Sequence, residues 1–478
     1  MIDRIVHEDA IWVPANRAGS RLARLFVVLA AAFGVVFVFT TPPFQVPDEP
    51  SHFYRTYQIA QGRFFAERRD RSAGGELPVS LVQTVEAVSG GISFHPENKA
   101  DPAAIRAALA VPLAPSRTAF VAFSNTAIYS FVPYLPQAVA VWAGRQFELS
   151  PLWLLYLGRL ANLFVSILLI GMAIRVTPVF ARGFLLIGLL PMTVFQMASV
   201  SPDAATNGLA LLFTAHIFAL AFGERRRVTP RAVGVLMVLG ALVAACKSAY
   251  FPLAFLFFLV PASKASSRRA YLAAAALVLA ASLISFYAWT RISAESFVPF
   301  YKGGYPSFEA AQKFIFEHPL LFARKLAGNL YYYGFFYVHS FVGILGWLDT
   351  PLPVAFVLIE VLALAAVAVF DDAWLRLTRW QWVLLGGVLA ASVAMVITSQ
   401  FILWTRMTAG SINRAQGRYF IPVAPLAFLL LRNLWPRSLR ARWQPPERAL
   451  AWIARALPAG GLLLALVWVI LRYYVAAW

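Results

Sequence analysis

The residues best suited to chemistry form a short acidic motif, Pro47-Asp48-Glu49-Pro50-Ser51-His52. Two adjacent carboxylates beside apolar sequence repel each other, so one pKa is expected to rise, which suits a general base near neutral pH. We therefore predict that Asp48 and Glu49 are catalytic. The alternative is that both acids favour the N-terminal dipole of a helix that begins near Ser51. His52 lies within reach of either acid, as a metal ligand, a hydrogen-bond partner or an interfacial side chain.

Carboxylates also suit Mg²⁺ or Mn²⁺, so Asp48, Glu49 and His52 form a tentative set of metal ligands. Catalysis without a metal is the alternative, and no other cofactor is expected. The chain lacks a phosphate-binding Gly-Lys-Ser/Thr loop, a His-Glu-x-x-His motif and a Gly-x-Ser-x-Gly motif, which argues against ATP as a substrate. A single cysteine, Cys246, excludes an intramolecular disulfide.

Further ionisable residues lie at the ends of apolar segments or inside one. Such groups usually face the interior of a helix bundle or a water-filled cavity, and the planar guanidinium of arginine matches phosphate oxygens in two-point contacts. We predict that the following residues bind substrate: Arg418, Tyr419, Lys247, Asp203, Arg159 and Asp349. The alternatives are that Asp203 caps the following helix and that Lys247 and Arg418 extend to lipid headgroups.

The elements that must position these residues are membrane-spanning helices. Of the 478 residues, 60% are hydrophobic and only 13% are charged, and apolar runs recur that can cross a hydrocarbon layer of about 30 Å. We predict an all-α integral membrane protein with about 11 transmembrane helices (range 10–13). The predicted spans are 22–41, 152–174, 183–200, 204–222, 232–247, 248–262, 270–290, 351–370, 381–400, 419–434 and 457–477. The alternative at the weakest point is one span through 232–262 and an additional crossing through 329–347.

The net charge of +19 would suggest nucleic-acid binding in a soluble protein. Here the basic residues lie in short loops between apolar spans, at 1–24, 175–182, 224–231, 264–269, 376–379 and 432–448. This pattern orients a multi-pass protein of the cytoplasmic membrane with its N-terminus in the cytoplasm. The expected partner is therefore the lipid bilayer and not nucleic acid, and the candidate site lies at the outer surface.

A long outer loop, 42–150, follows the first span. We predict a helix at 51–62 that lies along the membrane, because Phe53, Tyr57 and Ala60 share one face, and a second short helix near 100–110. Segment 128–146 is interrupted by Pro133 and Pro136, so we expect it to lie at the interface without crossing.

The motif Pro47-Asp48-Glu49-Pro50-x-His52-Phe53, followed by Tyr57-Gln58-Ile59-Ala60-x-Gly62, resembles the signature of a bacterial family of predicted membrane proteins of unknown function. That family is related to the GT-C superfamily of membrane glycosyltransferases. Weaker matches occur at Tyr134-Leu135-Pro136-Gln137, Gly158-Arg159-Leu160, Leu190-Pro191-Met192, Ser201-Pro202-Asp203, Gly346-Trp347-Leu348-Asp349 and Gly417-Arg418-Tyr419-Phe420. The resemblance covers about residues 20–435. It implies a GT-C-like transmembrane domain at 1–435, followed by a basic cytoplasmic loop and a last helix at 436–478.

The resemblance also implies a reaction. GT-C enzymes transfer a sugar from a polyprenyl-phosphate or polyprenyl-diphosphate carrier to an acceptor outside the membrane, with an acid of the first outer loop as base or metal ligand. That role falls on Asp48 and Glu49, and Asp203 matches an auxiliary acid. We therefore expect a glycosyltransferase that uses a polyprenyl-phosphate-linked sugar and an unidentified glycan, lipid or protein acceptor. The alternatives are a lipid or glycan transporter and a non-catalytic component of envelope polysaccharide assembly.

Overall fold

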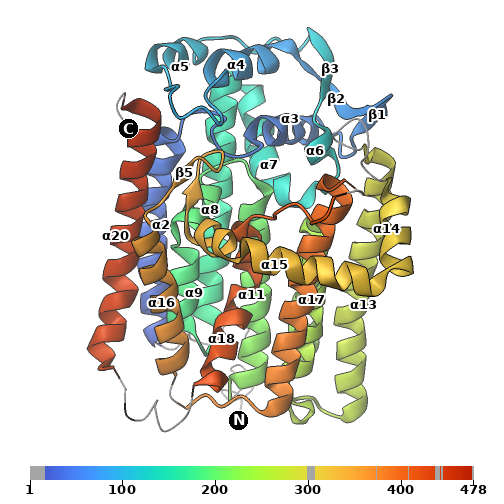
Figure 1. Ribbon diagram of the computed structural model, residues 1–478, viewed down its shortest axis with the longest axis vertical. Coiled ribbons are helices and arrows are strands. Elements are labelled where there is room, and N and C mark those ends of the chain that lie inside the picture. Colours follow the sequence, from blue (N-terminus) through green and yellow to red (C-terminus); the bar gives the residue numbers. More distant parts are fainter. Residues whose placement is uncertain are drawn as a thin grey trace, which may run out of the picture.

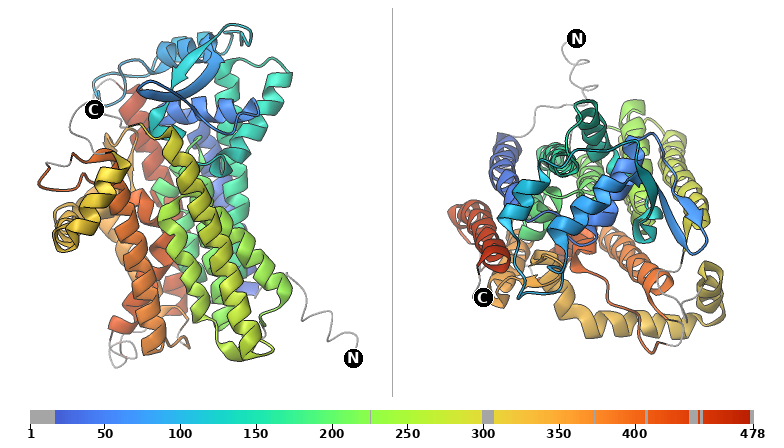
Figure 2. Two further views of the ribbon diagram at one scale, coloured as in Figure 1. Left: turned by 90° about the vertical axis from the view of Figure 1, so that its right-hand side faces the viewer. Right: turned by 90° about the horizontal axis from the view of Figure 1, so that it is seen from above.

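The computed structural model describes residues 17–224, 226–298, 307–372, 374–406, 409–435, 442 and 445–475. Long helices run roughly side by side and form a bundle, and residues 41–150 form a smaller layer over one end of it (Figures 1 and 2). We call this layer the cap, and the covered end of the bundle the cap end. The chain enters the cap where helix α2 (Arg17–Thr40) ends.

Six described helices are long and apolar enough to span a membrane, which confirms a helical membrane protein. They are α2, α8 (Pro151–Val176), α11 (Pro202–Phe222), α13 (Arg268–Ser296), α17 (Arg379–Trp404) and α20 (Glu447–Tyr474). Three shorter apolar helices accompany them: α12 (Pro230–Cys246), the 3-10 helix η2 (Ser248–Leu259) and α16 (Val354–Phe370). The count of about 11 crossings remains a prediction.

Two predicted spans are not continuous helices. The segment predicted at 183–200 is divided into α9 (Ala181–Gly188) and α10 (Pro191–Met197), because Pro191 disfavours helical backbone at the residue before it. The segment predicted at 419–434 consists of the 3-10 helix η4 (Gly417–Val423) and α18 (Ala424–Leu434). Pro422 lies within the 3-10 part, where the missing N–H is tolerated near a helix start.

Residues 232–262 form two packed segments and not one long span. Lys247 has extended backbone and separates α12 from η2, and the two helices contact each other. The segment offered as an alternative crossing lies in α15 (Pro319–Val342), which runs across the other helices near α14 (Phe308–Glu317) (Figure 1). Both observations agree with the two-segment assignment.

The cap is built around helix α3 (Glu49–Ala60), which lies across the cap end of the bundle (Figure 1). The predicted start at Ser51 is wrong, because Asp48 occupies the N-cap position. The predicted amphipathic surface helix is also wrong, since α3 is buried on nearly all sides. It packs against α6 (Ser124–Ala127), α7 (Leu135–Gln146) and strand β2 (Ser72–Pro78), which cover the sides that we expected to face lipid and water.

A three-stranded antiparallel sheet in the cap was not predicted. Its order is β1 (Glu67–Arg69), β2 and β3 (Thr118–Ala122), and Gly74 pairs with Ala122. A Cβ atom at Gly74 would lie 2.0 Å from the carbonyl oxygen of Val121, so only glycine fits there. Helix α4 (Val79–Ser89) follows β2.

Of two other predictions for the cap, the helix near 100–110 is confirmed, and the interfacial position of 128–146 stays a prediction. The short helix expected near 100–110 is α5 (Pro102–Ala108). The segment at 128–146 becomes a short 3-10 helix, η1 (Val132–Tyr134), and the 12-residue α7, which is too short to cross a bilayer.

Helix α20 packs against α2 and α16, so it belongs to the same bundle as the helices before it. Arg182 lies in the first turn of α9, Arg227 lies between α11 and α12, and Arg268 begins α13. The cytoplasmic position of these residues stays a prediction. Arg4, Arg225, Arg437 and Arg440, which the sequence assigned to the same side, lie outside the described residues.

Candidate active site beneath the cap

A cavity of about 840 Å³ lies between the cap and the cap end of the bundle. Its polar lining includes Asp48, His52, Asn125, Asp203, Lys247 and Arg418. Its apolar lining comes mainly from α13 and α17 and includes Phe286, Trp289, Met395 and Leu403. The cavity therefore combines a charged end with an apolar wall.

Asp48 lines this cavity and does not cap helix α3 through its side chain. Its backbone is left-handed (φ 61°), and its carboxylate makes no capping hydrogen bond. Instead, Oδ1 accepts a hydrogen bond of 3.0 Å from Nδ2 of Asn125. Burial raises the pKa of Asp48, and the positive charge of Arg418 and the bond from Asn125 partly oppose that rise. A carboxylate with these properties is suited to accept a proton.

Glu49 points away from the cavity, into the protein. Its two carboxylate oxygens accept hydrogen bonds from Nε and Nη2 of Arg159, at 2.9 and 2.5 Å, and both side chains are at most 1% exposed. Oε1 also lies 3.3 Å from the backbone N–H of Val200. Arg159 donates further hydrogen bonds to the carbonyl oxygens of Val38, Thr41 and Pro42.

The structure therefore separates the two acids that the sequence grouped together. Successive residues of a helix point about 100° apart, so Asp48 and Glu49 at the start of α3 face different surroundings. Neither Glu49 nor Arg159 is among the residues that line the cavity. Their pair ties α3 to α8 and to the end of α2.

Asp203 is the central anion of the cavity. Its Oδ1 accepts a bond of 3.0 Å from Lys247, and its Oδ2 lies 3.4 Å from Nε of Arg418 and 3.1 Å from Nε2 of Gln196. The capping alternative for Asp203 is wrong, because the N-cap of α11 is Ser201, whose hydroxyl accepts from the N–H of Asp203. Asp203 thus holds two cations in fixed positions.

Arg418 is only 4% exposed, yet its donors are poorly used. Its Nη2 lies 3.5 Å from the Tyr419 hydroxyl, and its Nε lacks an aligned hydrogen-bond acceptor among the described residues. Buried arginines elsewhere are better satisfied, since Arg159 has five short contacts to oxygen atoms. A buried guanidinium with unused donors beside a cavity is suited to bind an anion.

Lys247 and Tyr419, both predicted to bind substrate, contact each other in this cavity. Nζ of Lys247 lies 3.8 Å from the ring centroid of Tyr419 and 5.8 Å from that of Tyr129. Lys247 is therefore held by Asp203 and two aromatic rings, and does not extend toward headgroups as in the alternative interpretation. Tyr419 and Arg418 both line the cavity.

The tentative metal site is not assembled. Among the residues described, no group of three or more His, Cys, Asp or Glu side chains could hold a metal ion. Both oxygens of Glu49 are engaged by Arg159, and Nδ1 of His52 is engaged by the hydroxyl of Tyr134 at 2.7 Å. These three side chains therefore do not fit a shared cation.

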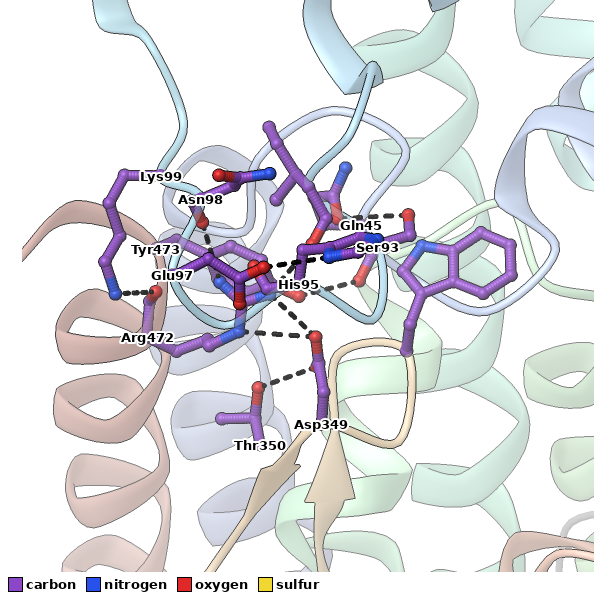
Figure 3. Close-up of polar contacts among 12 residues, drawn as sticks. Gln45, Ser93, His95, Glu97, Asn98, Lys99, Asp349, Thr350, Arg472 and Tyr473 are labelled. Atoms are coloured by element: carbon purple, nitrogen blue, oxygen red, sulfur yellow. Dashed lines mark hydrogen bonds and ion pairs between the residues drawn. The ribbon is translucent and has the colours of Figure 1, made fainter.

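Asp349 belongs to a different cluster, drawn in Figure 3. Its Oδ2 accepts a hydrogen bond of 2.7 Å from Nη2 of Arg472, near the end of α20. Arg472 also donates to the carbonyl oxygens of Ile92, His95 and Asn98. Asp349 is absent from the residues that line the cavity, so the structure places it outside the substrate-binding set.

The Arg472 cluster still affects the cavity, because the segments it joins carry two aromatic residues of the cavity wall. Phe94 and Trp347 both line the cavity, and their ring centroids lie 5.3 Å apart. The indole N–H of Trp347 donates to the carbonyl oxygen of Phe44, only four residues before Asp48. The cluster therefore positions one wall of the site from a distance.

Sequence analysis missed several polar groups of the cavity. Asn125 and Tyr129 lie in the cap without a recognisable motif, and Trp289 lies within the predicted span at 270–290. The tyrosine that binds His52, Tyr134, was quoted only as part of a family motif. Folding of the cap brings Asn125 to Asp48 and Tyr134 to His52, and no local pattern indicates these contacts.

Comparisons with known proteins give one match. A family model described as "Predicted membrane protein (DUF2142)" matches residues 32–427. No curated protein and no solved structure matches the chain. The matched region includes the cap and every residue of the polar lining described above. Since the match covers most of the 478 residues, the chain belongs to the DUF2142 family of predicted membrane proteins.

Proposed function

We propose that this protein is a membrane glycosyltransferase that moves a sugar from a polyprenyl-phosphate carrier to an acceptor hydroxyl at the outer face of the cytoplasmic membrane. One observation carries the proposal. The same cavity contains a buried guanidinium with unused donors, Arg418, and a partly buried carboxylate, Asp48, that forms no ion pair among the described residues. The first is suited to a phosphate and the second to a proton.

The shape of the cavity supports a lipid-linked donor. The charged end would receive the phosphate and sugar, with Arg418 and Lys247 near the phosphate oxygens. The wall formed by α13 and α17 would receive the first isoprene units against Trp289, Met395 and Leu403, since apolar surface gains free energy when it leaves water. A water-soluble nucleotide sugar would leave that wall without a partner.

The reaction would proceed as one displacement. The acceptor hydroxyl gives its proton to the Asp48 carboxylate while its oxygen forms a bond to the anomeric carbon. The bond between the anomeric carbon and the phosphate oxygen breaks, and its electron pair stays on the phosphate. The products are the glycosylated acceptor and polyprenyl phosphate, and the configuration at the anomeric carbon is inverted.

The charges in the cavity favour transfer of the electron pair to the phosphate. Negative charge grows on the leaving phosphate, so a fixed guanidinium stabilises the transition state more than the bound donor. Asp203 would orient Arg418 and Lys247 without taking part in bond making.

The test uses purified protein in proteoliposomes, a panel of undecaprenyl-phosphate-linked hexoses and pentoses, and a bacterial envelope extract as the source of the acceptor hydroxyl, with release of undecaprenyl phosphate as the readout. We expect carrier release with at least one donor by the wild type and no release by Arg418→Ala. The matched control is Arg227→Ala, at the opposite end of the bundle. Movement of an intact donor across the membrane without carrier release would instead support the transporter alternative.

A further inference from the structure

His52 is a polar group of the cavity whose tautomer can be assigned from one hydrogen bond. It lies one helical turn after Asp48, and its side chain lines the cavity. Its Nδ1 lies 2.7 Å from the hydroxyl oxygen of Tyr134. The rings of Tyr129 and Tyr134 pack around it, with centroids at 6.0 and 5.8 Å.

The donor of this hydrogen bond can be assigned from the surroundings of Tyr134. The Tyr134 side chain is fully buried, and His52 Nδ1 is its only hydrogen-bond partner among the described residues. Of the charged groups that influence Tyr134, Arg55 has the largest effect, and it has only donors to offer. A buried hydroxyl without an acceptor is costly, so the Tyr134 hydroxyl donates and Nδ1 of His52 accepts.

This assignment fixes the other ring nitrogen. A neutral imidazole has one N–H, and an accepting Nδ1 places that hydrogen on Nε2. Within the part of the chain that the structure describes, Nε2 has no hydrogen-bond partner and is not among the inaccessible unpaired atoms. Nε2 is therefore accessible, and because His52 lines the cavity, its N–H reaches that space.

The ring stays neutral at physiological pH. Burial lowers the pKa of His52 to about 3, with the charges of Arg418 and Lys247 acting in the same direction and that of Asp203 opposing them. Burial thus favours a neutral donor over an imidazolium, and the accepting Nδ1 leaves no lone pair for a base or a metal ligand.

We infer that His52 is held by Tyr134 as the Nε2–H tautomer and donates a hydrogen bond to an anionic oxygen of the ligand bound in the cavity. In the proposed reaction this oxygen is on the carrier phosphate, so the ligand assignment rests on the proposed function while the tautomer does not. His52 joins Arg418 and Lys247 as a third donor toward that anion. Tyr134 is a positioning residue.

The first test measures the tautomer by ¹⁵N NMR of histidine-labelled protein in nanodiscs at pH 7. His339 is an internal reference, because its Nε2 lies 2.7 Å from the carbonyl oxygen of Leu352, which can only accept. The His52 signals are assigned by their absence in His52→Gln. We expect a protonated Nε2 and a non-protonated Nδ1 for His52, and a mixture of tautomers in Tyr134→Phe. A protonated Nδ1 in the wild type would overturn the inference.

The second test measures binding of undecaprenyl phosphate to the detergent-purified protein. A hydrogen bond to a charged group corresponds to roughly 10- to 100-fold in affinity. We expect that loss in His52→Leu and a smaller one in His52→Gln, whose amide N–H lies near the position of Nε2. Equal affinity of His52→Leu and the wild type would refute the donor role. Absence of binding by the wild type would count against the proposed function, while the NMR result would still decide the tautomer.

Discussion

We predict that loss of the charge on Glu49 reduces the stability of the protein, whereas loss of the charge on Asp48 reduces the reaction rate. Glu49→Gln removes the anion that compensates Arg159, and both side chains are excluded from solvent. The new amide would also direct N–H groups toward the donors of Arg159. Breaking a buried ion pair by removing one partner typically costs about 3–5 kcal/mol.

Three carbonyl contacts remain for Arg159, at 2.9, 2.9 and 3.1 Å, so we expect a loss near the lower limit, about 3 kcal/mol. That is a large part of a typical folding free energy of about 5–15 kcal/mol. The measurement is the free energy of unfolding in mixed micelles by SDS titration. The double variant Glu49→Met with Arg159→Met should recover part of the loss, because an apolar pair leaves no buried charge, although the carbonyl groups that Arg159 contacts lose that donor.

The reasoning would be refuted if Glu49→Gln unfolded within about 1 kcal/mol of the wild type while turnover disappeared. In that case Glu49 would act in the reaction, as the sequence alone suggested. A destabilised protein that retains turnover at low temperature is the result we expect.

Three further predictions follow from other contacts. Arg418→Lys keeps the charge but loses the planar guanidinium, so donor-dependent turnover should fall at least tenfold (about 1.4 kcal/mol) at an unchanged melting temperature. Near-normal kinetics would instead indicate that Arg418 only contacts lipid headgroups. Arg472→Lys should make the peptide bond after Lys99 accessible to trypsin, because three contacts to carbonyl oxygens of the 92–98 segment are lost. An unchanged cleavage rate, measured by mass spectrometry, would contradict the role of Arg472 in positioning that segment. In a Cys246→Ala background, Arg71→Cys should react with an impermeant thiol reagent in intact cells, and Arg227→Cys should not. Position 71 lies between β1 and β2 of the cap, and position 227 lies between α11 and α12, at the opposite end of the bundle. Labelling of position 227 and not of position 71 would show that the predicted orientation is reversed.

The helical membrane architecture could be predicted because apolar length is a property of the local sequence. Runs of apolar residues identified α2, α8 and α13 within a few residues. The divided helices α9 and α10 were read as one span, because the run of apolar residues continues through Pro191. The cap sheet was missed because its strands are short and because β3 pairs with β2 over a long sequence separation.

The candidate site, like the fold, could be predicted from the sequence only in part. Asp48 could be named in advance because it belongs to a pair of adjacent acids. Asp203, Lys247 and Arg418 could be named because ionisable side chains at the ends of apolar segments are unusual. Whether such a residue serves the cavity or the scaffold depends on which partner the fold provides. Glu49 meets Arg159 and Asp349 meets Arg472, and neither partner could be inferred from the local sequence.

The stability of the Asp48→Asn variant distinguishes a catalytic from a structural role of that acid. Since burial raises the pKa of Asp48, folding favours its protonated form. The stabilisation is present below the unfolded pKa of about 3.9 and is lost as the pH rises through the folded pKa. At pH 7 the asparagine variant, which keeps an acceptor for Asn125, should therefore melt no lower than the wild type.

The most direct test of the proposed function is the rate of carrier release by Asp48→Asn in proteoliposomes, followed from pH 4 to 8 beside the wild type. We predict a loss of about 10²–10⁴-fold for the variant. We also predict that the wild-type rate falls with decreasing pH, with an apparent pKa above that of an ordinary aspartate. Wild-type turnover by Asp48→Asn across this range would contradict the assignment of Asp48 as the base.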